Sequence, residues 1–345
     1  MNEPHVMQRR AADAFRGALV ADALAMPVHW YYDQRALLRD YPEFAADAPP
    51  GFIAPRSPHA DSILWRSSYT PLNEKGEILH DQAQYWGRRG VHYHQFLAAG
   101  ENTLNHRLAT ELAALVRRNR DYDPERWLDD YVAFMLTPGR HRDTYVEEYH
   151  RHFFTNLASG RKPINCGVRD VHIGGLVPVP ALVAALGPKH PDLRRLVRLH
   201  VNLTHKDADV LDAADALARM LVRICAGDDL RETILAEGAD WISAAKVQAW
   251  EREPDHVVVG GRLSSACYIP DAFPAALFLA WRHAGDFHTG VAANARVGGD
   301  NCHRGAVVGS LLGASSPIPH GLLEGLAARG RVDETFPPDP AAATR

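Results

Sequence analysis

The sequence predicts an all-α protein that folds as a single domain. Apolar residues recur at helical spacing through most of the chain, and strand signals are few, the clearest being residues 257–259. Hydrophobic residues make up 46% of the 345 residues and charged residues 23%, which are ordinary values for a protein with a sizeable core. We expect one helical domain over residues 1–335 and a disordered, proline-rich tail over residues 336–345.

Helical patterns follow one another along the chain. Small and apolar residues predict a first helix over residues 7–26, which Pro27 ends. Residues 33–80 hold many Pro, Gly and polar residues without a sustained period, a composition typical of lids and binding segments. Further helices are expected over residues 103–119, 124–136, 143–158, 191–203, 207–226, 229–249, 270–283 and 287–295.

The last strong helical pattern covers residues 304–314 and carries a stripe of glycines. Gly305, Gly309 and Gly313 repeat every four residues and therefore lie on one face of the expected helix. Because glycine has no Cβ, such a face lets another backbone approach closely. We expect this helix at the centre of a crowded bundle.

Composition excludes several classes of partner. The net charge of −4 leaves no basic footprint for nucleic acid or an anionic membrane surface. No apolar run approaches the ~18 residues that span a bilayer, and residues 1–10 do not resemble a signal peptide. The four cysteines form no close pair, which favours reduced thiols and a cytoplasmic location. The oligomeric state is left open.

Two loop-to-helix junctions concentrate polar side chains. The segment Gly299-Asp300-Asn301-Cys302-His303 has a glycine turn, and Asp300 is placed to cap the helix that follows. The segment Gly100-Glu101-Asn102-Thr103 precedes the helix over residues 103–119. Each junction can be a plain helix cap, with Cys302 buried as a small hydrophobe, or part of a functional site.

Three further segments carry candidate residues. His29 ends the first helix beside three aromatic residues, where core packing and stacking on a flat ligand are both possible. His92 and His94 are possible ligands, although two histidines alone are weak evidence for a metal. His172 lies in a glycine-rich loop that is either a substrate contact or a connection.

In their order, these segments resemble the ADP-ribosylglycohydrolase family, which includes the dinitrogenase-reductase-activating glycohydrolases and the J1-type crystallins. The resemblance runs from about residue 8 to about residue 330. Residues 17–27 look like the opening G-x-x-x-G-D-A-L-G-x-P helix, and residues 204–207 look like the T-H-x-D motif. Residues 298–300 look like the start of the G-G-D-T-D-T segment. The resemblance implies the family's orthogonal helical bundle.

The resemblance also implies a chemistry that this chain departs from. Typical members hydrolyse the bond between ADP-ribose and its acceptor with two Mg²⁺ or Mn²⁺ ions, held by a T-D-D-T and a D-T-D-T motif. Residues 100–103 and 300–303 stand at these motifs here, and Asn102 and Cys302 remove two carboxylates. His29 stands where the family has an acidic residue. Because Mg²⁺ needs oxygen ligands, we do not expect the magnesium pair.

We therefore expect an enzyme on this scaffold with a remodelled, Mg-independent site for a small-molecule or nucleotide-like substrate. The family default is hydrolysis of an ADP-ribosyl or related N- or O-glycosidic bond. A metal-free acid–base lyase, dehydratase or cyclase in small-molecule metabolism is one alternative, and a non-catalytic ligand-binding or crystallin-like protein is another.

The expected roles are as follows. Glu101 and Asp300 are expected to act as acid–base groups, His303 as a proton carrier or orienting residue, and Cys302 as a nucleophile or ligand. Neither a metal ligand nor a cofactor is expected, with a single Zn²⁺ on Cys302, His303 and a distant His or Glu101 as the other option. The residues expected to contact substrate are His29, Asn102, Thr103, His172 and Asn301.

Overall fold

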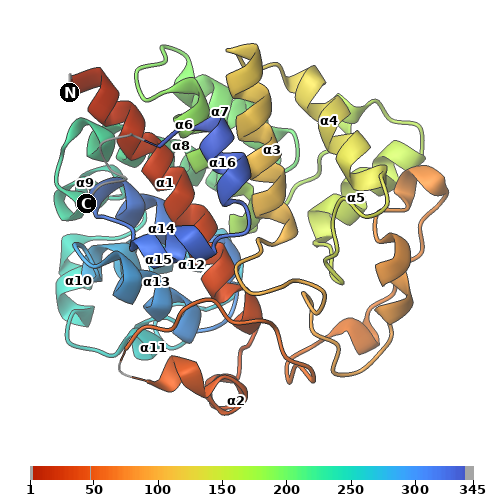
Figure 1. Ribbon diagram of the computed structural model, residues 1–345, viewed down its shortest axis with the longest axis horizontal. Coiled ribbons are helices and arrows are strands. Elements are labelled where there is room, and N and C mark those ends of the chain that lie inside the picture. Colours follow the sequence, from red (N-terminus) through yellow and green to blue (C-terminus); the bar gives the residue numbers. More distant parts are fainter. Residues whose placement is uncertain (1–2, 47, 339–345) are drawn as a thin grey trace.

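Helices α1 (Glu3–Ala25) and α14 (Asn301–Ser315) lie side by side at the centre of the protein (Figure 1). The computed structural model describes residues 3–46 and 48–338, and within them the fold is all-α. Around the central pair pack α6 (Pro178–Leu186), α8 (Ala208–Ala226), α12 (Ile269–Arg282) and α13 (Phe287–Arg296), and α3 (Leu104–Asn119) packs against α6. The β pairing within the described residues consists of isolated bridges, such as the one between His172 and Tyr268.

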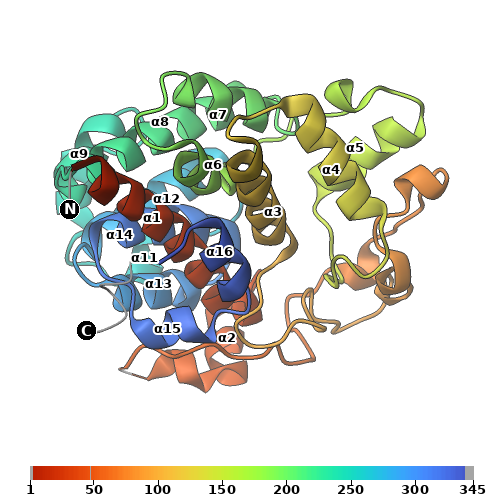
Figure 2. The same ribbon diagram turned by 45° about the horizontal axis from the view of Figure 1, so that its top comes forward.

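Helices α4 (Pro124–Leu136) and α5 (Glu148–Ala158) form an outlying pair beyond α3 (Figure 2). The remaining α-helices are α2 (Gln34–Asp40), α7 (Leu193–Asn202), α9 (Leu230–Glu237), α10 (Ala244–Trp250), α11 (Asp255–Val258), α15 (His320–Gly325) and α16 (Arg329–Thr335). Short 3₁₀ helices lie at η1 (Met26–Val28), η2 (Pro42–Ala45), η3 (Leu64–Arg66), η4 (Glu74–Gly76), η5 (His80–Tyr85), η6 (Pro163–Asn165) and η7 (Ile173–Leu176). No helix among the described residues is both long and apolar enough to cross a bilayer.

Three expected elements differ from the structure. The expected strand over residues 257–259 does not form, because Val258 is the last residue of α11 and Val259 makes a single bridge to Leu263. The helix over residues 229–249 is two helices, since the Ser243 side chain accepts a hydrogen bond from Lys246 N and starts α10 anew. The helix over residues 143–158 begins only at Glu148, because Thr144 N donates to Tyr93 O instead.

The start of the expected tail packs against the body of the protein. Phe336 is buried, and its ring meets that of Phe15 edge to face at a centroid distance of 6.0 Å. Arg16 donates a hydrogen bond to the Phe336 carbonyl oxygen. A disordered tail from residue 336 is therefore wrong at its first residue, and residues 339–345 lie outside the described residues.

The glycine stripe of α14 allows α1 to pack directly on its backbone, which confirms the expectation from the sequence. A Cβ added at Gly309 would lie 2.2 Å from Gly17 O, and one added at Gly17 would lie 2.2 Å from Gly309 O. A Cβ at Gly313 would lie 2.6 Å from Asp13 O. These approaches bring the C-terminal end of α1 next to the N-terminal end of α14.

Gly309→Ala is expected to destabilise the protein by about 3 kcal/mol, because the added methyl group would overlap a backbone oxygen that cannot move alone. The matched control is Gly330→Ala in α16, where a Cβ meets nothing within 4 Å. That change should be neutral or stabilising by up to about 1 kcal/mol. Urea unfolding of both variants measures the difference, and equal stabilities would contradict the close packing.

Candidate active site

The turn before α14 is tied to the end of α1 by backbone hydrogen bonds. Trp30 N donates to Gly299 O at 2.8 Å, and Gly299 N donates to Tyr31 O at 2.6 Å. Gly299 has a φ of 65°, and a Cβ there would lie 2.0 Å from Ser265 O, so only glycine fits. This pairing brings His29 and Asp300 together from opposite ends of the chain.

Asp300 is the centre of a buried cluster. It occupies the N-cap position of α14, but its side chain accepts no capping hydrogen bond, which corrects the expected capping role. Its Oδ1 atom instead lies 2.9 Å from His29 Nε2 and 2.7 Å from His303 Nδ1. All three residues are at most 2% exposed. We call His29, Asp300 and His303 the central cluster.

A line of side chains extends from the central cluster to a second aspartate. His29 Nδ1 lies 2.8 Å from His94 Nε2, and His94 Nδ1 lies 2.8 Å from Asp143 Oδ1. The Trp30 ring stacks on the His29 ring at a centroid distance of 3.7 Å and shields it from one side. Two imidazoles therefore connect two fully buried carboxylates.

Glu147 and Asn105 border the central cluster on its other side. Glu147 Oε1 lies 3.3 Å from His303 Nδ1, and Glu147 Oε2 accepts a hydrogen bond from Asn105 Nδ2 at 2.5 Å. Asn105 Nδ2 also lies 3.1 Å from His303 Nε2. The Asn105 Oδ1 atom in turn lies 3.0 Å from the Tyr149 hydroxyl and 2.8 Å from His150 Nε2, so the amide is held from both ends.

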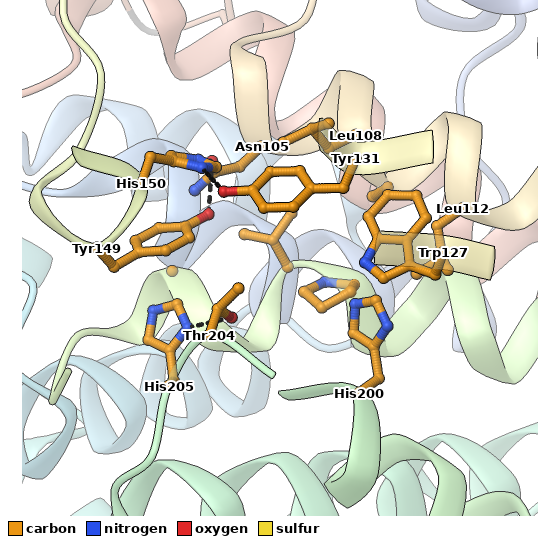
Figure 3. A pocket seen from close by; sticks show the side chains of 15 residues that line it. Asn105, Leu108, Leu112, Trp127, Tyr131, Tyr149, His150, His200, Thr204 and His205 are labelled. Carbon is orange, nitrogen blue, oxygen red and sulfur yellow. Dashed lines mark hydrogen bonds between the residues drawn. The ribbon is translucent and has the colours of Figure 1, made fainter. Parts of the chain in front are cut away.

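Two hollows meet at Asn105, which lines both. The larger, of about 440 Å³, lies between α3, α4 and α5 on one side and the α7–α8 region on the other, and Figure 3 shows Tyr131, Tyr149 and His205 facing it. The smaller hollow, of about 230 Å³, adjoins the central cluster. Its lining residues are His29, Trp30, His94, Thr103, Leu104, Asn105, Asp143, Tyr145, Glu147 and His303.

Burial and close pairing shift the pKa values of the central cluster and Glu147 in different directions. Burial lowers the pKa of His29 to about 3, although Asp300 acts in the opposite direction. Burial also acts against a charge on His303, but Asp300 and Glu147 outweigh it and raise the pKa of His303 to about 9. Burial would raise the pKa of Asp300, yet the two imidazoles hold it well below its ordinary value. For Glu147 burial dominates, and its pKa is raised.

The junction at residues 100–103 is held in place by Asp22, a buried aspartate of α1. Asp22 Oδ1 accepts from the Thr103 hydroxyl at 2.7 Å and lies 3.1 Å from His106 Nδ1. Asp22 Oδ2 accepts from Thr103 N and from Asn102 Nδ2, both at 2.9 Å. Asn102 and Thr103 therefore fix the start of α3, and Thr103 also lines the smaller hollow. Burial would raise the pKa of Asp22, but His106 and these hydrogen bonds lower it.

Glu101 and His172 lie apart from the contacts of the central cluster. Glu101 is partly exposed, forms an ion pair with Arg142 at 2.6 Å and accepts from Ala98 N at 2.7 Å. His172 Nδ1 lies 2.9 Å from Asp170 Oδ1, and its ring packs on Tyr268. Neither residue lines the smaller hollow. Their assigned roles stay predictions without a contact to the centre.

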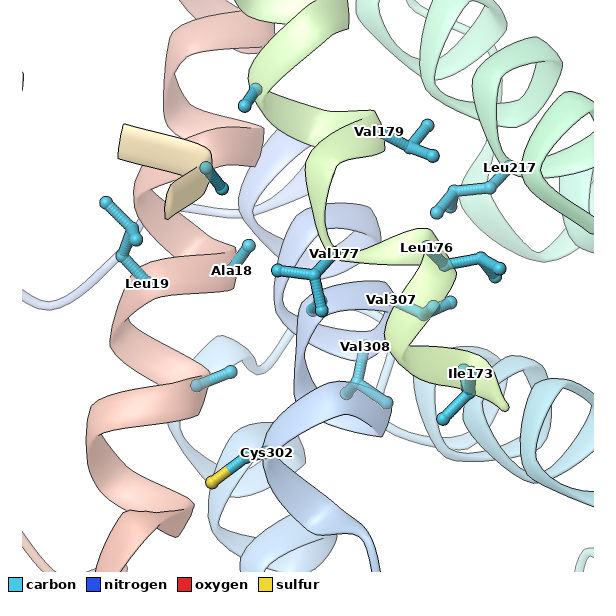
Figure 4. Close-up of a cluster of buried hydrophobic side chains, with 14 of the residues drawn as sticks. Ala18, Leu19, Ile173, Leu176, Val177, Val179, Leu217, Cys302, Val307 and Val308 are labelled. Carbon is cyan, nitrogen blue, oxygen red and sulfur yellow. The ribbon is translucent and has the colours of Figure 1, made fainter. Parts of the chain in front are cut away.

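Asn301 and Cys302 lie in α14 but face the protein body. Asn301 Nδ2 donates to Val28 O at 3.2 Å and to Ala295 O at 3.0 Å, so it fastens two neighbouring segments. Cys302 Sγ lies 3.7 Å from Asp22 O, among the apolar side chains between α1 and α14 (Figure 4). Burial raises the pKa of this thiol well above its ordinary value, which disfavours a thiolate.

Sequence reasoning assigned no role to Asn105, Asp143 or Glu147, and it treated His94 only as a weak candidate. Asp143 and Glu147 lie in the segment expected to be helical, which is extended before α5. Asn105 lies in the first turn of α3, one turn from the expected cap. No spacing in the sequence connects these residues with the central cluster, because only the tertiary fold brings the start of α3 and the segment before α5 next to the start of α14.

A family model and a solved structure are similar to this chain. The model of the family described as ADP-ribosylglycohydrolase matches residues 3–342. A solved structure described as "ADP-ribosylglycohydrolase-related protein complex" is 23% identical, with a TM-score of 0.63 and a match covering 96% of each chain. No curated protein matches this chain.

Proposed function

Because the chain belongs to the ADP-ribosylglycohydrolase family, we propose that it hydrolyses an ADP-ribosyl or related N- or O-glycosidic bond without a magnesium pair. The observation that carries this proposal is the buried central cluster, whose His29 and His303 line a small hollow together with the carboxylates of Glu147 and Asp143. Carboxylates and imidazoles in a pocket are the groups that general acid–base hydrolysis uses.

The side chains at the two motif positions do not suit two magnesium ions. The central cluster offers two imidazole nitrogens and one carboxylate, whereas Mg²⁺ prefers six oxygen ligands. At the junction over residues 100–103, the Asn102 amide donates hydrogen bonds to Leu19 O and Asp22, and Glu101 forms an ion pair with Arg142. Four positive charges would therefore meet too few free carboxylate oxygens.

In the proposed reaction, a water molecule in the smaller hollow attacks the anomeric carbon. The central cluster orients this water and accepts its proton, while its oxygen forms the new bond to carbon. Glu147, on the wall of the same hollow, donates a proton to the leaving nitrogen or oxygen as the glycosidic bond breaks. Asn105 positions both the proton donor and the central cluster, because its amide contacts Glu147 and His303.

A metal-free acid–base lyase, dehydratase or cyclase is the second candidate. The line from Asp300 through His29 and His94 to Asp143 favours it, because hydrogen-bonded imidazoles can pass a proton between two carboxylates. Such a relay serves an elimination as well as a hydrolysis.

Incubation with ADP-ribosyl-arginine, ADP-ribosyl-serine and NAD tests the proposal, with released ADP-ribose measured by chromatography. We expect release from at least one compound without added Mg²⁺, and no stimulation when Mg²⁺ is added. Release that depends on Mg²⁺ would contradict the Mg-independent site. Absence of release from all three would reject the ADP-ribosyl substrate and favour the lyase or a non-catalytic binder.

A further inference from the structure

We propose that the central cluster is a mononuclear site for a borderline divalent transition ion such as Zn²⁺, with His29 Nε2, Asp300 Oδ1 and His303 Nδ1 as its protein ligands. The inference concerns the same site as the proposed function and deepens it. It can be tested without any substrate.

The spacing of the three atoms fits ligands around one ion. Asp300 Oδ1 lies 2.9 Å from His29 Nε2 and 2.7 Å from His303 Nδ1, and all three atoms lie within 4.8 Å of one another. Ligand atoms about 2.1 Å from an ion lie about 3 Å apart at right angles and about 3.4 Å apart in a tetrahedron, so the two Asp300 contacts would lengthen by a few tenths of an ångström around Zn²⁺. Three side chains from two ends of the chain thus converge at coordination distance.

Two atoms of the central cluster have no hydrogen-bond partner. Asp300 Oδ2 is buried and unpartnered, and His303 Nδ1 forms no hydrogen bond despite lying 2.7 Å from Asp300 Oδ1. A buried polar atom without a partner costs about 1–3 kcal/mol, and more when it is charged. An ion bound by Asp300 and His303 would give His303 Nδ1 a partner, and a carboxylate that binds through both oxygens would give Asp300 Oδ2 one as well.

The number of protons available for the hydrogen bonds beside the central cluster also supports a bound cation. Three contacts link Asp143, His94, His29 and Asp300, and each contact needs one proton. Two neutral imidazoles supply only two. An ion on His29 Nε2 removes the shortage, since His29 Nδ1–H then donates to His94 and His94 Nδ1–H donates to Asp143.

Binding of the ion by His303 also requires a change at Asn105. Ligation at His303 Nδ1 places the ring proton on Nε2, which lies 3.1 Å from the amide nitrogen of Asn105. The amide must therefore turn so that its oxygen accepts this proton. The turn would break the hydrogen bond from Asn105 to Glu147, whose Oε1 atom lies 3.3 Å from His303 Nδ1. Glu147 is then released as a further oxygen ligand or proton donor.

The donor set decides the class of ion. Imidazole nitrogen with carboxylate oxygen suits Zn²⁺, Mn²⁺, Fe²⁺ and Co²⁺, whereas Mg²⁺ and Ca²⁺ prefer oxygen alone. Cys302 faces the apolar side of α14, so a thiolate does not take part. The ion therefore has no sulfur ligand.

The test starts from the full-length protein as purified, followed by chelation and reconstitution with Zn²⁺, Co²⁺ or Mg²⁺. We expect about one transition ion per chain by elemental analysis, and a higher melting temperature with Zn²⁺ but not with Mg²⁺. The Co²⁺ form should show visible ligand-field bands without a thiolate charge-transfer band. A folded protein that binds neither Zn²⁺ nor Co²⁺ would overturn the proposal, and so would stabilisation by Mg²⁺ alone.

Variants locate the ion. Asp300→Asn and His303→Gln should each lose Zn²⁺ and the Co²⁺ bands, with circular dichroism confirming that they fold. His94→Gln, which changes only a supporting residue, should weaken Zn²⁺ binding about 10- to 100-fold. Glu101→Gln and Cys302→Ala should bind Zn²⁺ like the parent protein, because neither side chain contacts the cluster. Binding retained in both Asp300→Asn and His303→Gln would overturn the assignment.

Failure of this inference differs from failure of the proposed function. A folded protein that binds neither Zn²⁺ nor Co²⁺ but still releases ADP-ribose would reject the metal site and leave the hydrolase. Stoichiometric Zn²⁺ binding without release from any tested compound would reject the hydrolase and leave the metal site.

Discussion

Asp300→Asn is expected to lower kcat for release of ADP-ribose by about a thousandfold. Among residues 3–46 and 48–338, Asp300 is the only carboxylate in contact with both His29 and His303, so its charge organises the groups that activate water in the proposed reaction. Asparagine keeps the size of the side chain but removes this charge. The measurement is the steady-state rate on whichever ADP-ribosyl compound the parent protein cleaves.

Glu101→Gln is the matched control for Asp300→Asn. Both changes neutralise an acidic residue at a family motif, but Glu101 pairs with Arg142 at the surface. We expect its kcat within about twofold of the parent value, since exposed ion pairs contribute little. A fully folded Asp300→Asn variant with parental kcat would remove Asp300 from the mechanism, and a large loss in Glu101→Gln would restore the role expected from the sequence.

Asp22→Ala is expected to lower the free energy of unfolding by about 3–5 kcal/mol. The change would leave Thr103 N–H, the Thr103 hydroxyl and the Asn102 amide without their buried acceptor, beside His106. Asp22→Asn keeps the shape and should cost less, about 1–3 kcal/mol. Urea unfolding monitored by circular dichroism measures both.

The control for Asp22 is a surface aspartate in an ion pair. Asp212 pairs with Arg198 at 2.7 Å and is largely exposed, so Asp212→Ala should cost no more than about 1 kcal/mol. Equal losses in Asp22→Ala and Asp212→Ala would mean that the start of α3 does not depend on the buried carboxylate.

The helical fold and the two loop-to-helix junctions could be predicted from local patterns in the sequence. Apolar residues at helical spacing, Pro27 after the first helix and the glycines of α14 are local signals, and α1, α3, α4 and α14 form where these signals lie. The pair of glycines before Asp300 predicted the turn because their backbone conformation is strained for other residues. The same local signals made the resemblance visible, since the family motifs are helix ends.

Which polar side chains contact one another depends on how the helices pack. Asp300, His303 and His29 converge because Gly17 and Gly309 let α1 and α14 pack backbone to backbone. Glu101 pairs with Arg142, although Thr103, two residues later, lines the smaller hollow. Cys302 faces the core, although the next residue, His303, lines that hollow. Adjacent residues on a helix point in different directions, and contacts across more than a hundred residues depend on packing, so no local pattern could assign Asp143 and Glu147 to the centre.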